Sequence, residues 1–388
     1  MEITRASTGA DLAKKNAGPG RRDRYIKEKK VGEGTYAVVY LGRQVSTNRN
    51  VAIKKIKVGQ FKDGLDMSAI REIKFLSELR HDNVIELIDV FTSAGTSRSL
   101  NLVLEYLSAD MEVMIKDRSI HFSAADMKSW MYMTLSGLYH CHRHGVLHRD
   151  LKPNNLLLSP TGHLKLADFG LARQQPGPYE PMTPTVVTRW YRAPELLLGS
   201  RSYTRKIDIW AVGIIFIELM LRTPYLPGQT DLDQLDLTFR AFGTPTEETW
   251  PGVSSLPDYF YDKNATAGTT DSGKKTGIYP APQPDEMRQR FVAASDNALA
   301  MLNAMTKLNP AERIDTKDAL AAEYFREQPR PTPPEELPKP SKTATINDGA
   351  KVGSNNSEFD QTLQRREKSA EQIRRTKAIG DVARKLQF

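Results

Sequence analysis

The run H-R-D-L-K-P-N-N, residues 148–155, places three side chains of different chemistry in one short loop that a proline bends. Asp150 can orient an attacking hydroxyl group and accept its proton, and Lys152 can neutralise negative charge that builds up on a transferred phosphoryl group. Asn155 can offer a neutral oxygen ligand to Mg²⁺. This set of residue types predicts a catalytic loop for phosphoryl transfer.

A second motif, D-F-G at 168–170, begins thirteen residues after Asn155. Its aspartate, Asp168, can supply a carboxylate to the same Mg²⁺ ion. The tripeptide alone occurs often by chance, but its spacing from the loop and the A-P-E that follows at 193–195 do not. The ordered set therefore carries much more weight than any of its parts.

The segment G-E-G-T-Y-A-V, residues 32–38, predicts a turn whose glycines let backbone N–H groups approach phosphates closely. A dinucleotide-binding motif is excluded, because Ala37 stands at the third small position and no helix follows at once. Downstream, V-A-I-K places Lys54 on a strand, and A-I-R-E places Glu72 on a helix 18 residues later. Glu72 can pair with Lys54 and hold its ammonium group toward phosphate oxygens.

The elements around these motifs divide into two parts. Alternating β-branched and apolar runs predict strands at 38–45, 50–56 and 100–106, and apolar residues at helical spacing predict one helix at 68–79. After residue 108 long helical patterns dominate. We therefore expect an α+β fold with a β-rich part at 24–107 and a mainly helical part at 108–325.

The remaining segments are expected to lie outside the packed fold. Residues 1–23 form a basic extension and the low-complexity run 264–277 predicts a flexible surface loop. Residues 326–388 are rich in proline and charge, and we expect them to be disordered or bound to a partner. The division predicted from the sequence is thus 1–23, 24–107, 108–325 and 326–388.

The net charge of +8 lies in the two ends of the chain. Residues 1–30 carry nine basic and four acidic side chains and residues 326–388 carry thirteen and nine, which leaves the body at −1. Direct binding of nucleic acid would require a basic stripe on a folded face, and none is indicated.

The longest apolar run, 13 residues from Ile209, is too short for a membrane span. A polar N-terminus and a single cysteine, Cys141, indicate no signal peptide and a reducing compartment.

Taken together, the motifs resemble the eukaryotic protein kinase family over roughly residues 25–325. The resemblance implies a two-lobed fold with ATP between the lobes and Mg²⁺ on Asn155 and Asp168. The residues implied to surround ATP are Val31, Gly32, Glu33, Gly34, Val39, Ala52, Lys54, Leu104, Glu105, Leu107, Asp110, Leu157 and Asp168.

The resemblance also implies individual roles. Backbone groups of Glu105 and Leu107 would hold the adenine ring, with Leu104 at the back of the pocket and Asp110 near the ribose. Thr188 would hydrogen-bond Asp150 and Lys152. Two structural roles follow in the same way: Asp208 would brace the catalytic loop, and Arg313 would pair with Glu195.

S-A-I-R-E at 68–72 and V-V-T-R-W-Y-R-A-P-E at 186–195 are similar to the cyclin-dependent group of that family. In that group a cyclin pushes the helix inward so that Glu72 reaches Lys54. Val187 would adopt an unusual backbone conformation, held by Arg192, that turns its carbonyl away from the substrate. Because proline lacks an N–H group that needs an acceptor, Ser-Pro and Thr-Pro substrates are expected.

Thr183 lies in the proline-rich run that precedes this anchor and is expected to be a phosphorylation switch. In the kinase fold Arg71, Arg149 and Arg173 would come together beside it, three cations without a carboxylate partner, and a phosphate on Thr183 would bridge them. The alternative is a plain threonine in a turn. Thr35 and Tyr36 match inhibitory phosphosites of cell-cycle kinases, or are simply loop residues.

Longer matches resemble the kinase subunits of transcription factor TFIIH in their fungal form, among them M-T-L-S-G-L-Y-H-C-H-R, Y-L-P-G-Q-T-D-L-D-Q-L and the pair Asn154–Asn155. This implies a nuclear enzyme that works with a cyclin H-like subunit, a RING-finger assembly subunit and the TFIIH core. The implied substrate is the heptad-repeat tail of RNA polymerase II. Two alternatives stay open: a cell-cycle kinase or activator of other cyclin-dependent kinases, and an inactive scaffold, although every catalytic residue is present.

Overall fold

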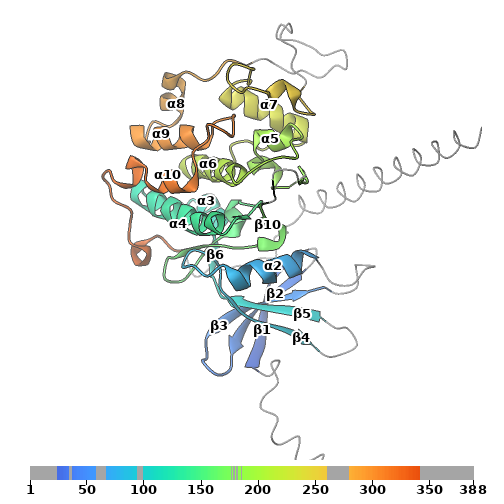
Figure 1. The fold of residues 1–388 in the computed structure, drawn as a ribbon. Helices are drawn as coiled ribbons and strands as arrows, with labels where there is room; N and C mark the ends of the chain where they lie inside the picture. Colours follow the sequence, from blue (N-terminus) through green and yellow to red (C-terminus); the bar gives the residue numbers. More distant parts are fainter. Residues whose placement is uncertain are drawn as a thin grey trace, which may run out of the picture.

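The chain folds into two lobes, a β-rich lobe and a larger, mainly helical one (Figure 1). This arrangement confirms the predicted α+β kinase-type fold. The computed structural model describes residues 24–34, 37–57, 67–93, 99–175, 177, 180, 182–184, 186–259 and 279–340.

The smaller lobe (N-lobe) is a five-stranded antiparallel sheet in the order β1-β2-β3-β5-β4, with one helix, α2, packed beside it. Its elements are β1 (Tyr25–Glu33), β2 (Ala37–Gln44), β3 (Asn50–Ile56), α2 (Met67–Glu78), β4 (Leu87–Ser93) and β5 (Ser99–Glu105). Alternation along β3 sends Val51 and Ile53 to one buried cluster and Ile56 to another, where Ile56 meets Ala69 of α2. The sheet is therefore apolar on both faces at its central strand β3.

The larger lobe (C-lobe) is built mainly from helices (Figure 1). Its helices are α3 (Met111–Lys116), α4 (Ala124–Arg143), α5 (Pro194–Leu197), α6 (Lys206–Leu221), α7 (Asp231–Phe242), α8 (Pro284–Arg290), α9 (Asp296–Met305) and α10 (Thr316–Leu320). Its short strands are β6 (Ala109–Asp110), β7 (Val146–Leu147), β8 (Leu156–Leu158), β9 (Leu164–Leu166) and β10 (Arg173–Gln174). Single 3₁₀ turns are η2 (Pro153–Asn155), η3 (Phe169–Leu171), η4 (Arg189–Tyr191), η5 (Val253–Ser255), η6 (Glu323–Phe325) and η7 (Pro334–Glu336).

Two helices form the centre of the C-lobe. Helix α6 is apolar around its whole circumference and is almost entirely buried, as expected for a helix enclosed by other elements. Helix α4 begins with a capping box in which Ser123 and Asp126 each bond the other's backbone N–H, so its start is fixed at Ala124. These two helices provide a rigid base for the loops that carry the chemistry.

The loop after α2 ties the N-lobe helix to the C-lobe. The Asn83 side chain donates to the carbonyl of Leu164 at 2.8 Å, and the Ile85 N–H donates to the carbonyl of Leu166 at 2.9 Å. Both acceptors belong to β9, which leads directly into Asp168. The position of α2 is thus coupled to the segment that carries this aspartate.

The prediction that the chain stops packing at residue 326 is wrong for residues 326–340. The buried Lys128 ammonium on α4 donates to the carbonyls of Glu327, at 3.2 Å, and Pro329, at 2.9 Å. Thr332 bonds Asp126 at 2.6 Å, and Leu337 is buried. A proline-rich segment keeps its carbonyl acceptors, and a buried ammonium group needs such acceptors, so this segment lies along α4, with η7 as its one element of secondary structure.

Several sequence predictions fall outside the described residues: Thr35, Tyr36, the extension 1–23, the loop 264–277 and the rest of the tail, 341–388. Within the described ranges, each helix is too short or too polar to cross a lipid bilayer.

Candidate active site

The catalytic loop holds the Asp150 carboxylate with donors on both oxygens. Oδ2 accepts from Lys152 Nζ at 2.8 Å and from Asn155 Nδ2 at 3.0 Å. Oδ1 accepts from the Thr188 hydroxyl at 2.9 Å and from the Thr188 N–H at 3.2 Å. Thr188 also accepts from Lys152 Nζ at 3.1 Å. The structure thus brings the four residues together, and Asp150 has one fixed orientation.

Asp208, at the start of α6, holds the backbone of the catalytic loop. Its carboxylate accepts the backbone N–H of His148 at 3.0 Å and that of Arg149 at 2.9 Å, and it contacts His142 Nε2 at 2.9 Å. Burial alone would raise the pKa of Asp208, but these hydrogen bonds outweigh it and hold the pKa below its usual range. The charged carboxylate therefore fixes the loop backbone, and Arg149 there takes φ of 65°.

Lys54 of β3 and Glu72 of α2 form a closed ion pair. Lys54 Nζ lies 2.7 and 2.9 Å from the two Glu72 oxygens and 3.6 Å from Asp168 Oδ1. Burial alone would lower the pKa of Lys54, but Glu72 and Asp168 outweigh it and raise the pKa well above its usual range. The ammonium group thus stays charged next to the carboxylate of the D-F-G motif.

Helix α2 packs closely on the D-F-G motif through Ser68. An added Cβ at Gly170 would lie 2.3 Å from the Ser68 hydroxyl oxygen, so a larger residue there would force the Ser68 side chain of α2 to move. Asp168 precedes it with φ of 62°, a left-handed conformation that non-glycine residues seldom adopt. Such strain is common at functional sites.

Residues expected to surround ATP come from both lobes. Leu104, Glu105 and Leu107 are buried at the junction of the lobes. The partly exposed apolar side chains are Val31, Val39 and Ala52 of the sheet and Leu157 of β8, while Gly32 lies on β1. Among contacts between described residues, the Leu107 backbone N–H and carbonyl have no partner, which leaves both for an adenine edge. Gly34 N–H bonds the Ala37 carbonyl, and Glu33 is exposed and pairs with Lys57 at 2.8 Å.

Asp110 caps α3, where its carboxylate accepts the Val113 N–H at 2.9 Å. Burial raises the pKa of this carboxyl from 3.8 to about 6. The folded state therefore binds the proton more tightly than the unfolded chain does. The stability that this proton contributes is present at low pH and is lost as pH rises through about 6.

We compare the unfolding free energy of the wild type with that of Asp110→Asn. The difference, wild type minus variant, is expected to fall by about 1–2 kcal/mol between pH 5 and 7. Asparagine keeps the helix cap but does not titrate, so the difference isolates the carboxyl group. Urea titrations of both proteins across this pH range measure it. A difference that rises with pH would contradict the assignment.

The residues expected to bind Mg²⁺ fit a hard cation. Asn155 turns its amide N–H group to Asp150, which leaves its amide oxygen as a ligand. The Asp168 carboxylate is 47% exposed, and Lys54 holds its pKa below the usual range, so it is negatively charged. Mg²⁺ in such sites takes few protein oxygens together with phosphate and water oxygens.

The activation segment carries Thr183, whose side chain is exposed. Its carbonyl accepts the Tyr203 hydroxyl at 2.9 Å, and the same hydroxyl accepts Arg149 Nη1 at 3.0 Å. Arg71 is exposed on α2. The prediction that the three arginines lack a carboxylate partner is wrong for Arg173, whose guanidinium lies 3.8 Å from the Glu180 carboxylate, where the Glu180 N–H bonds back to the Gly177 carbonyl.

Val187 and Arg192 lie together at the end of this segment. Val187 has φ of 68°, and its carbonyl accepts Arg192 Nη2 at 3.1 Å. Sequence reasoning missed Asp231 of α7, whose Oδ1 lies 3.0 Å from Arg192 Nη1 and 2.8 Å from Arg189 Nε. It also missed Tyr203. Neither residue has a local sequence signal, since each contacts residues at least 20 positions away.

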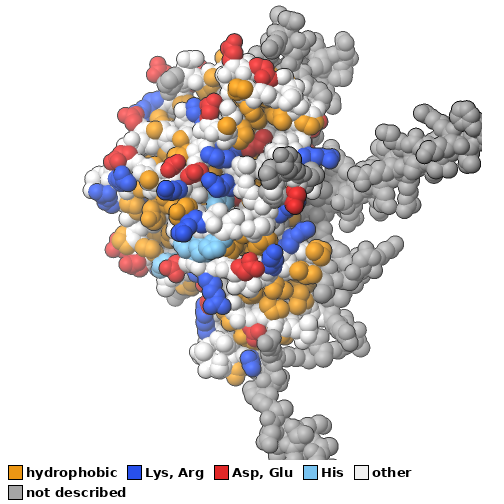
Figure 2. Space-filling model, viewed as in Figure 1, with side chains coloured by type: hydrophobic (Ala, Val, Ile, Leu, Met, Phe, Trp, Pro, Cys, Tyr) orange, Lys and Arg blue, Asp and Glu red, His pale blue; other side chains and the backbone are white. Residues whose placement is uncertain are grey.

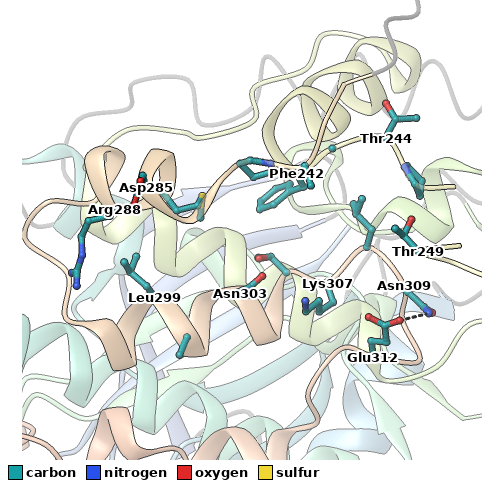
Figure 3. A pocket seen from close by; sticks show the side chains of 18 of the residues that line it. Phe242, Thr244, Thr249, Asp285, Arg288, Leu299, Asn303, Lys307, Asn309 and Glu312 are labelled. Carbon is teal, nitrogen blue, oxygen red and sulfur yellow. Dashed lines mark hydrogen bonds between the residues drawn. The ribbon is translucent and has the colours of Figure 1, made fainter.

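A separate concavity of about 730 Å³ lies in the C-lobe between the end of α7, α8 and α9 (Figure 3). Phe242 and Leu299 contribute apolar walls, and Asn303 and Lys307 of the α9 region also line it. It shares no lining residue with the site around Asp150.

Comparison with known proteins gives one family. The protein kinase domain matches residues 25–325. The chain is 58% identical over 313 residues to serine/threonine-protein kinase KIN28 of Saccharomyces cerevisiae, covering 81% of this chain and 97% of that protein. It is 47% identical over 324 residues to cyclin-dependent kinase 7 of Xenopus laevis, covering 83% and 86%.

A solved structure agrees with these relatives. The CAK complex from Chaetomium thermophilum bound to ATP-γ-S contains a chain with a TM-score of 0.76 and 45% sequence identity, which covers 84% of this chain and 100% of that one. Together with the site geometry, these matches show that the chain belongs to the protein kinase family, as a cyclin-dependent serine/threonine kinase of the KIN28 and CDK7 type.

Proposed function

We propose that this kinase transfers the γ-phosphoryl group of ATP to serine followed by proline in the heptad repeats of the RNA polymerase II tail, as part of TFIIH. The observation that carries the proline requirement is the backbone at Val187. Its carbonyl is held by Arg192 Nη2 and Nε, at 3.1 and 3.3 Å, and cannot accept from a substrate. If the residue after the target serine has a backbone N–H, that N–H finds no acceptor here and is left unpaired. Proline has no backbone N–H and therefore avoids this cost.

The chain's own residues supply the steps around the transfer. Asp150 orients the serine hydroxyl and accepts its proton while the oxygen attacks phosphorus. Lys152 bonds both Asp150 and Thr188, so the base keeps its direction. Lys54, held by Glu72, would contact phosphate oxygens of ATP. Mg²⁺ on Asn155 and Asp168 would neutralise phosphate charge when bound.

The face expected to meet a cyclin is partly apolar. Met67, Ile70 and Leu171 are 57%, 37% and 37% exposed on α2 and η3. In Figure 2 hydrophobic side chains gather over the part of the N-lobe where Figure 1 places α2. A partner subunit that covers this face with an apolar surface of its own would stabilise the position of α2. It would thereby also stabilise the ion pair formed by Lys54 and Glu72.

The other partners are part of the same proposal. The matches to KIN28 and CDK7 support a cyclin partner and a nuclear transcription role. We propose a cyclin H-like subunit, a RING-finger assembly subunit and the TFIIH core as the partners in that role. The likeness to a chain of the CAK complex supports a second candidate, activation of other cyclin-dependent kinases. The two functions differ in substrate and use the same chemistry.

The deciding experiment is phosphate transfer from labelled ATP with Mg²⁺ to a peptide of repeated Y-S-P-T-S-P-S. The chain alone is compared with the chain purified with its native partners. A second peptide carries alanine after each target serine, and we expect its kcat/KM to be about 10- to 100-fold lower, the cost of one unpaired N–H. Asp150→Asn serves as the blank.

Equal transfer to both peptides would contradict the proline requirement. No transfer to the heptad peptide, with brisk transfer to the activation segment of another cyclin-dependent kinase, would favour the second candidate. Transfer to neither substrate by the partner-bound chain would favour the inactive scaffold.

A further inference from the structure

Tyr203 lies in the loop between α5 and α6 and contacts both the catalytic loop and the activation segment. Its hydroxyl accepts Arg149 Nη1 at 3.0 Å and donates to the Thr183 carbonyl at 2.9 Å. The residue is 5% exposed, and burial raises the pKa of its phenol, so the hydroxyl keeps the proton that it donates. A buried phenol whose donor and acceptor are both used has a defined position.

The Arg149 guanidinium is fixed at a second point. Its Nε donates to the Leu171 carbonyl in η3 at 2.8 Å, and its backbone N–H is held by Asp208. Neutral acceptors therefore orient this arginine toward the activation segment while Thr183 carries no phosphate.

The activation segment is fixed at the same place through its backbone. The Met182 N–H donates to the Arg201 carbonyl at 2.8 Å, one residue before the contact between Thr183 and Tyr203. Met182 is buried, whereas the Thr183 side chain is exposed. This docking uses no side-chain atom of Thr183, so it is compatible with either state of the hydroxyl group.

We propose that Tyr203 is a positioning residue that holds the activation segment and Arg149 in their working arrangement when Thr183 is not phosphorylated. This inference rests on the proposed function for its activity readout. A phosphate on Thr183 would bind Arg149 by charge-assisted hydrogen bonds and make the phenol largely redundant. The hydroxyl of Tyr203 thus sets how strongly activity depends on that phosphate.

The test combines Tyr203→Phe with Thr183→Ala, because alanine keeps the backbone carbonyl that Tyr203 contacts. In partner-bound Thr183→Ala protein, Tyr203→Phe is expected to lower kcat on the order of tenfold, the loss of a bond to a charged group. In protein fully phosphorylated on Thr183, the same change should lower kcat by less than about threefold. Tyr259→Phe, which removes a bond to the Pro245 carbonyl, is the matched control.

Hydrogen exchange gives a readout that does not need catalysis. Tyr203→Phe should speed exchange at the Met182 amide in unphosphorylated protein, while thermal unfolding checks that each variant is folded. Faster exchange without any transfer to the heptad peptide would support this inference and contradict the proposed function. Equal loss of kcat in both phosphorylation states, or unchanged exchange at Met182, would overturn the role of Tyr203.

Discussion

Replacement of Asp150 by asparagine is expected to lower kcat by about 10³-fold, the usual contribution of a positioned general base. The amide cannot take the proton of the attacking hydroxyl. It also places an N–H₂ group against donors that now point at a carboxylate, namely Lys152, Asn155 and Thr188. Single-turnover transfer from labelled ATP measures the loss directly.

Two controls separate chemistry from binding. Nucleotide affinity, measured by titration calorimetry, should change little, because no expected ATP contact is removed. Asp82→Asn removes the same charge from an exposed position and should keep kcat within about twofold. An Asp150→Asn protein that retains a tenth or more of wild-type kcat would contradict the assignment of Asp150 as the base.

Replacement of Arg313 by methionine is expected to lower the free energy of unfolding by about 3–5 kcal/mol. Its guanidinium bonds both Glu195 oxygens, at 2.8 and 2.9 Å, and both side chains are buried. It also donates to the carbonyls of Lys206, Lys307 and Leu308. Without it, Glu195 becomes a buried charge with no counter-ion at the end of the activation segment.

Urea unfolding measures this cost, and a double change separates its causes. Arg313→Met with Glu195→Gln removes the uncompensated charge and should recover part of the stability. Arg49→Ala breaks the exposed pair with Glu86 and should cost less than about 1 kcal/mol. A loss below about 1 kcal/mol for Arg313→Met would show that the buried pair does not anchor this segment.

The division into a β-rich and a helical lobe was predictable from local periodicity. Apolar alternation in 50–56 predicted the strand that is observed as β3, and helical spacing at 68–79 predicted α2 to within one residue. Successive side chains of a strand point to opposite faces, and residues three or four apart share one face of a helix, so burial of such faces leaves a period in the sequence itself. The packing of residues 326–340 was not predictable in this way, because it uses the backbone carbonyls of Glu327 and Pro329 and isolated side chains such as Thr332 and Leu337, which form no regular period.

The sequence by itself determined the chemical groups of the candidate site, because Asp150, Lys152 and Asn155 lie within one loop and their spacing can be read directly. Only the tertiary structure decided which distant groups hold them. Asp231 reaches Arg192 across 39 residues, and Tyr203 reaches Arg149 across 54. Such contacts depend on how helices and loops pack in three dimensions, and no local pattern records that packing. The resulting network of buried hydrogen bonds fixes the activation segment against the catalytic loop.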